Sequence, residues 1–128
     1  MANFNSVVVI GRLTSDPELR YAPSGAPVCS FTVATSRRIT DDSGESVVQT
    51  TFLDVDTWRR MAEVCAQFLK KGREVLVMGT LRQSRWVDPD TKEPRTKIKV
   101  VAQQVQFLGG SRGSHDLSVE DHSDGAQA

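Results

Sequence analysis

The chain has 128 residues, in which 16 Lys and Arg balance 16 Asp and Glu, and 38% of the residues are hydrophobic. This length favours one domain with a tail, and no apolar run approaches the length of a membrane span. The start of the chain lacks the basic segment and long apolar run of a signal peptide, so we expect a cytoplasmic protein without a membrane partner.

The zero net charge hides an uneven distribution along the chain. Residues 1–110 carry 15 Lys and Arg against 12 Asp and Glu, whereas residues 111–128 carry one Arg against four acidic residues. A mildly basic body with an acidic tail is typical of nucleic-acid binders. Residues 111–128 also contain few apolar side chains, so we expect a folded domain over 1–110 and a disordered tail over 111–128.

Three main strands and one short strand are predicted before the middle of the chain. Residues 6–13 are rich in β-branched side chains, and residues 18–21 return as the short strand. Residues 28–36 alternate between two faces, and residues 47–56 form the returning strand after a polar turn at 41–45.

One helix follows these strands and has the clearest periodicity in the sequence. Thr57 is the predicted N-cap, and Gly72 is the predicted left-handed residue after the helix. The residues that share its apolar stripe are Met61, Val64, Cys65, Phe68 and Leu69.

The stretch from Arg73 to Trp86 is a strand that begins apolar and ends polar. Its first half is apolar on both faces, and Gly79 predicts a bulge. Its second half carries Arg82, Arg85 and Trp86, which is typical of a binding arm but also of a solvated hairpin whose Trp covers the core edge. A turn at 88–90 leads to the last strand, over 96–107.

This order of elements predicts an all-β fold. Three strands, one α-helix and two further strands are the order of a five-stranded Greek-key OB barrel with the helix between strands 3 and 4. The arm at 82–99 is then the loop between strands 4 and 5, which OB barrels commonly use to hold oligonucleotides. A small sandwich with one helix is the alternative architecture.

Nothing in the sequence favours catalysis, a metal or a cofactor. The two histidines, His115 and His122, lie in the expected tail, and Cys29 and Cys65 are too far apart for a metal motif. Both cysteines lie within apolar patterns, so we expect buried thiols in a reducing compartment. Asp54 and Asp56 share a strand face, where they form either an acid/base pair or a solvated surface. We expect a protein that is not an enzyme and has no catalytic residues.

A binder of single-stranded nucleic acid needs flat rings for the bases and cations for the backbone. The candidate rings are Phe52, Trp58 and Trp86. Phe52 could equally belong to the core, and Trp58 could instead fasten the helix entry to the barrel. Basic residues stand beside two of the rings, with Arg59 and Arg60 after Trp58 and Arg85 before Trp86.

Three stretches carry a family resemblance, namely VVVIGRLTSDPELRYAPSGAPVCSFTVATSRR, MAEVCAQFLKKGREVLVMGTLRQSRWVD and FLGG. Over about residues 4–110 the chain resembles the bacterial single-stranded DNA-binding protein family. The resemblance implies an OB fold, sequence-independent binding of single-stranded DNA in replication, recombination and repair, no catalysis and usually a homotetramer. It places the stacking rings on Phe52, Trp58 and Trp86. It places the phosphate contacts on several of Arg20, Arg37, Arg60, Lys70, Lys71, Arg82 and Arg85.

The sequence departs from the family pattern in two places. Many members carry a further aromatic residue where this chain has Ile39 and Thr40. The family's acidic Pro-Phe tip, which docks replication and repair proteins, is replaced by Gly-Ala-Gln-Ala, so the sequence does not predict that recruitment. A protein-interaction OB module and an RNA-binding OB domain remain the alternatives.

Overall fold

A closed five-stranded barrel forms the body of the protein, in a computed structural model that describes residues 2–109 and 117–120. The barrel strands are β1 (Val7–Leu13), β3 (Pro27–Thr40), β4 (Ser46–Trp58), β5 (Glu74–Val87) and β6 (Pro94–Leu108). They are hydrogen-bonded in the order β1-β5-β6-β4-β3, and an additional pairing of β1 with β3 closes the ring. The predicted OB barrel is confirmed, and the sandwich alternative is wrong.

One helix, one parallel strand pairing and two short strands complete the topology. Helix α1 (Arg59–Phe68) joins β4 to β5, and a parallel pairing of Val55 with Val100 places β4 beside β6. The short strand β2 (Glu18–Tyr21) adds to the outside of β3. One further short strand, β7 (Leu117–Glu120), pairs antiparallel with β6.

The core fills the barrel and the space beneath the helix. Strand β5 buries alternate residues, as the pleat of a strand with one covered face requires, whereas β6 buries Val100, Val101 and Ala102 in a row before it alternates. The apolar stripe of α1 packs on this core through Met61 and Cys65, and Cys29 is also fully buried. The prediction that both thiols are buried is therefore confirmed.

The helix begins later than the sequence indicated. Thr57 is not the N-cap, because the pairing of β3 with β4 continues through Val28 and Trp58 and keeps Thr57 in the strand. Thr57 is buried, and its hydroxyl donates a hydrogen bond of 2.8 Å to the carbonyl oxygen of Cys29. Trp58 stands at the N-cap instead, although an indole ring has no acceptor for a capping hydrogen bond.

One of the two predicted glycine roles in this region is confirmed in full. Gly72 has the predicted left-handed conformation, with φ of +87°, but it does not end the helix, because α1 ends at Phe68 and its C-cap is Leu69 in extended conformation. The β5–β6 register shifts between Met78 and Gly79, which marks the predicted bulge. A Cβ atom at Gly79 would lie only 2.1 Å from the carbonyl oxygen of Val101, so β6 approaches too closely for any side chain.

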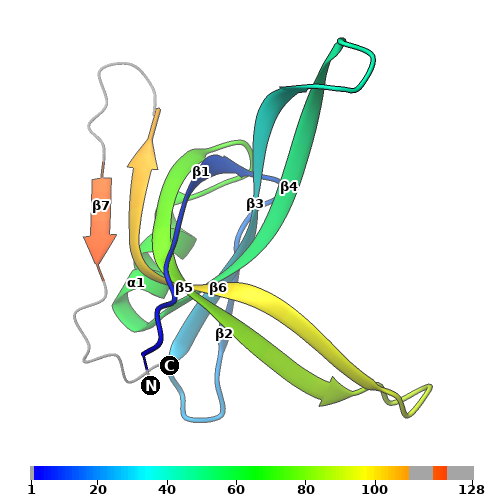
Figure 1. The fold of residues 1–128 in the computed structure, drawn as a ribbon. Coiled ribbons are helices and arrows are strands. Elements are labelled where there is room, and N and C mark those ends of the chain that lie inside the picture. Colours follow the sequence, from blue (N-terminus) through cyan, green and yellow to red (C-terminus); the bar gives the residue numbers. More distant parts are fainter. Residues whose placement is uncertain (1, 110–116, 121–128) are drawn as a thin grey trace.

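Two long hairpins extend beyond the barrel (Figure 1). We call the β3–β4 hairpin the first arm and the β5–β6 hairpin the second arm. The first arm turns at residues 41–45 and the second at 88–93, where Asp88 and Glu93 share a backbone hydrogen bond of 2.9 Å. The two arms diverge from the place where β4 and β6 pair, so they form a fork with the barrel at its base.

Most of the expected tail lies outside the described residues, including His115 and His122. Its expected disorder is therefore not described, and the four residues of β7 are the part of 111–128 that the structure places.

Candidate nucleic-acid interface

Phe52 is an exposed ring on the first arm. It shares its face of β4 with Asp54 and Asp56, whereas the intervening Val55 points into the core. Its side chain is 64% exposed, so the alternative that Phe52 belongs to the core is wrong. An exposed ring of this size is a suitable platform for a nucleobase.

Trp86 is the corresponding ring on the second arm. It lies opposite Arg95 in the β5–β6 register and is 47% exposed. Strand alternation places Arg82 and Ser84 on its face of β5, with Lys99 and Lys97 opposite them on β6. The two rings therefore lie on different arms, with the base of the fork between them.

Trp58 lies between the arms, at the end of β4. It is half-buried, and its indole nitrogen is buried without a hydrogen-bond partner among the described residues. Trp58 lines a cavity of about 370 Å³ together with Arg20, Arg82 and Arg85. The three guanidinium groups make this cavity suited to an anionic, hydrogen-bonding ligand, although Asp56 also lines it.

The predicted basic residues thus fall into two groups. The structure brings Arg20, Arg82 and Arg85 together with Trp58, and all three are exposed. The others are exposed but line neither this cavity nor the larger one described next, and they are Arg37, Arg60, Lys70 and Lys71.

Strand alternation separates Arg37 from the exposed ring of the first arm. Arg37 shares the parity of the buried residues Phe31 and Val33, so it lies on the opposite face from Phe52. Arg38 is on the same face as Phe52 and donates a hydrogen bond of 3.2 Å to Ser46. Arg38 is not among the phosphate contacts that the resemblance implies, although its parity relative to the buried strand residues places it on the face of Phe52.

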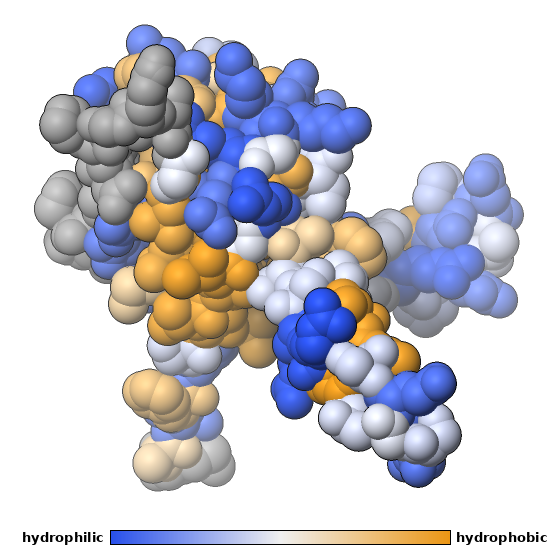
Figure 2. Space-filling view, turned by 90° about the horizontal axis from the view of Figure 1, so that it is seen from above, coloured by the Kyte–Doolittle hydropathy of each residue, from blue (hydrophilic) through white to orange (hydrophobic). Residues whose placement is uncertain are grey.

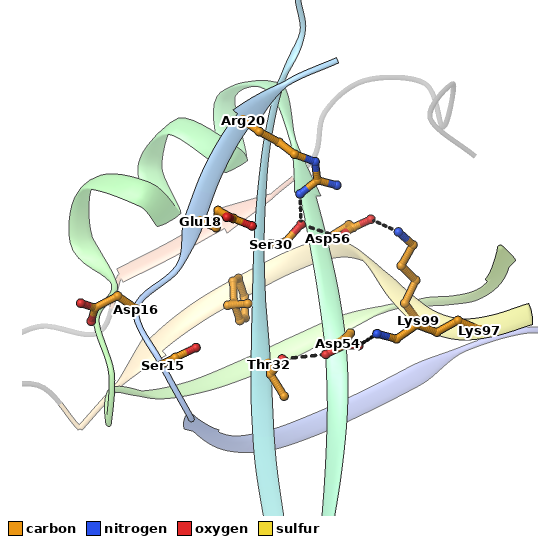
Figure 3. A pocket seen from close by; sticks show the side chains of 11 residues that line it. Ser15, Asp16, Glu18, Arg20, Ser30, Thr32, Asp54, Asp56, Lys97 and Lys99 are labelled. Carbon is orange, nitrogen blue, oxygen red and sulfur yellow. Dashed lines mark hydrogen bonds and ion pairs between the residues drawn. The ribbon is translucent and has the colours of Figure 1, made fainter. Parts of the chain in front are cut away.

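A larger cavity of about 470 Å³ lies at the base of the fork (Figure 3). One chain of contacts crosses it. Arg20 Nη1 donates to Ser30 Oγ at 2.7 Å, and Ser30 Oγ donates to Asp56 Oδ1 at 2.7 Å. Lys99 Nζ lies 2.7 Å from the other carboxylate oxygen of Asp56, so four strands, β2, β3, β4 and β6, are linked in one row.

A second, parallel row lies beside the first. Thr32 Oγ1 donates to Asp54 Oδ1 at 2.6 Å, and Lys97 forms an ion pair with Asp54 Oδ2 (Figure 3). The hydrogen bonds from Lys97 and Thr32 hold the pKa of the Asp54 carboxyl below its usual value. Asp54 is therefore an ionised partner of Lys97 rather than half of an acid/base pair.

Among the described residues, no group of three or more His, Cys, Asp or Glu side chains could hold a metal ion. No helix within 2–109 and 117–120 is long and apolar enough to cross a membrane.

The model of the single-strand binding protein family matches residues 4–108. The chain belongs to this family. Among its relatives, "Single-stranded DNA-binding protein" of Treponema pallidum is 44% identical over 114 residues, which are 88% of this chain and 62% of the relative. "Single-stranded DNA-binding protein A" of Bacillus subtilis is 46% identical over 114 residues, 86% of this chain and 64% of the relative. The chain thus spans less than two thirds of the length of these family members.

Solved structures share the family fold. "Plasmodium falciparum SSB complex with ssDNA" matches with a TM-score of 0.79 at 22% identity, covering 85% of this chain and 98% of that one. A single-stranded DNA-binding protein from Thermus aquaticus matches with a TM-score of 0.74 at 30% identity, covering 84% of this chain and 52% of that one. The first likeness concerns the fold alone, because its sequence identity is low.

Proposed function

We propose that this family member binds single-stranded DNA without sequence preference and protects it in replication, recombination and repair. The observation that carries the proposal is the placement of exposed Phe52 and Trp86 on two arms, with Trp58 and a basic cavity between them. Rings bind bases of any identity, because every base has a π-face, and each stacked base contributes roughly 1–3 kcal/mol.

The phosphate backbone of the DNA lies along the basic side chains. Arg20, Arg82 and Arg85 contact phosphates beside Trp58, where their guanidinium groups can donate paired hydrogen bonds. Among the remaining predicted phosphate contacts, Arg60, Lys70 and Lys71 extend the path around the helix ends. Arg37 extends it onto the face of the first arm that lies opposite Phe52. This function is binding without catalysis, in the cytoplasm and at the nucleoid.

Tryptophan fluorescence titrated with oligo-dT tests the proposal, because the chain has two Trp residues, Trp58 and Trp86, and both belong to the proposed site. We expect quenching, with log K falling against log salt by about 0.7 per phosphate contact. A binding constant that does not change with salt contradicts the basic path. Equal affinity for oligo-rU would instead favour the RNA-binding alternative.

We also propose that the chain forms a homotetramer. Figure 2 shows apolar side chains gathered on one face of the barrel. Val8 and Met78 lie directly opposite each other on β1 and β5 and are exposed, as is Ile10. A second copy would bury these side chains. Light scattering should give four chains for the wild type and fewer for Val8→Lys; a monomeric wild type contradicts the proposal.

A further inference from the structure

The two ion pairs at the base of the fork join strands that belong to different arms. Asp54 and Asp56 lie on β4, in the first arm, and Lys97 and Lys99 lie on β6, in the second. The ladder between β4 and β6 is short, covering the pairs Val55–Val100 and Asp56–Val101. The ion pairs therefore lie where the two arms begin to separate.

This place is on the path between the two exposed rings. Asp54 is two residues along β4 from Phe52 on the same face. Lys97 is two residues along β6 from Arg95, which lies opposite Trp86. Single-stranded DNA that stacked on both rings would pass over the Asp54–Lys97 pair. Its phosphates would then lie close enough to contact a free ammonium group.

The ammonium group of Lys97 is not free. Asp54 neutralises it, and the low pKa of the Asp54 carboxyl keeps that carboxylate ionised at neutral pH. Asp56 is buried and forms an ion pair of 2.7 Å with Lys99. A phosphate that approached either lysine would meet a carboxylate already bound to it, so each pair presents almost no net charge to the strand.

We infer that Asp54 limits the affinity of this chain for single-stranded DNA by holding Lys97 in an internal ion pair, away from the phosphates. The inference rests on the proposed function and adds a residue that weakens binding, where the sequence predicted residues that strengthen it. Lys97 is then a counter-ion of the protein and contributes little to binding in the wild type.

Asp54→Asn is the variant that tests this. Asn has the same shape and can still accept the hydrogen bond from Thr32, and Asp54 is partly exposed, so the fold should be retained. Freeing one lysine should tighten oligo-dT binding about fivefold to tenfold at about 50 mM salt and steepen the salt slope by about 0.7. Asp42→Asn, at the tip of the first arm, removes the same charge far from the fork and should change affinity less than twofold.

Lys97→Gln completes a double-mutant cycle. Alone it should weaken binding, because Asp54 is then an unpaired carboxylate on the path of the DNA, and in the Asp54→Asn background it should abolish the gain. A double variant that keeps the gain overturns the inference, as does an equal gain from Asp42→Asn, and Asp54→Ser takes the place of Asp54→Asn if that variant does not fold. If the wild type binds and Asp54→Asn binds no tighter, only this inference fails. If neither the wild type nor any variant binds oligo-dT, the proposed function fails with it.

Discussion

The side chain of Asn5 makes two hydrogen bonds with the backbone of Leu81, 76 residues later. Asn5 Nδ2 donates to the Leu81 carbonyl at 2.8 Å, and the Leu81 N–H donates to Asn5 Oδ1 at 2.8 Å. The ladder between β1 and β5 ends at the pair Val7–Gly79, just before this contact. The amide of Asn5 thus continues the ladder past the bulge and ties the base of the second arm to the N-terminal segment.

Replacing Asn5 with Ala should loosen the second arm while leaving the barrel intact. Both hydrogen bonds are exposed, so water compensates in part and the loss in unfolding free energy should be about 1 kcal/mol. Amide hydrogen exchange is the measurement. The Leu81 amide should exchange faster, whereas the amides of buried Val75 and Val77 should not change; uniform acceleration across β5 would contradict a local role.

Most of the fold could be predicted because its signals are local and repeated. The apolar stripe of α1 and the alternation within β3 and β4 each depend on several residues, so one misleading position does not alter them. Thr57 shows the limit of this reasoning. Its hydroxyl suits an N-cap, but the pairing partner that keeps it in β4 lies in β3, far away in sequence.

The site residues that could be predicted from the sequence are large rings that occur in polar, exposed segments. Trp86 stood out because a large ring followed two arginines on a segment leaving the core. The pairing of Asp54 with Lys97 was not predicted, because it depends on which strands are neighbours and in which register. One signal could have suggested it: Asp54 and Asp56 are two residues apart on β4, and Lys97 and Lys99 are two residues apart on β6.

The two cysteines should be unreactive in the folded protein. Burial raises the pKa of the Cys29 thiol from 9.0 to about 11 and raises that of Cys65 further. A thiol reagent such as DTNB should therefore label neither residue at pH 8 until the chain unfolds, and then both. Rapid labelling of the native protein would show that the core opens.

The same shift makes the unfolding free energy fall at high pH. Cys29 in the unfolded chain loses its proton near pH 9.0, whereas in the folded protein it keeps the proton until about 11. The unfolded state therefore gains the charged form first, so stability should decline as the pH rises from 9 towards 11. Cys29→Ala should show a shallower decline in denaturant melts over this range.

Replacing Gly79 with Ala should destabilise the barrel strongly. The new methyl group would lie 2.1 Å from the carbonyl oxygen of Val101, and both groups belong to the paired backbones of β5 and β6. Neither strand can move without breaking the ladder, so we expect a loss of about 3 kcal/mol or more.

Gly44→Ala is the control for Gly79→Ala. Gly44 lies in the turn of the first arm with φ of +86° and no atom near the added methyl group, so the loss should be about 1 kcal/mol. Chemical denaturation of both variants gives the comparison, and equal losses would show that the bulge can adapt.

Trp86→Ala should weaken DNA binding far more than it weakens the fold. The ring is 47% exposed on the second arm, so its removal should cost about 1–3 kcal/mol of affinity for oligo-dT. The loss in unfolding free energy should be much smaller than the 3–5 kcal/mol that emptying a buried aromatic site costs. Because this variant lacks one of the two Trp residues, anisotropy of labelled oligo-dT is the appropriate measurement.

Phe68→Ala is the matched control for Trp86→Ala. Phe68 is similarly exposed, at 43%, but it lies on α1, and its ring centroid is 6.4 Å from that of buried Phe107. Its removal should lower the melting temperature through the lost packing and leave affinity unchanged. If Trp86→Ala instead melts early while its folded fraction binds normally, the ring supports the fold of the arm. The bases would then have to stack on Phe52 and Trp58 alone.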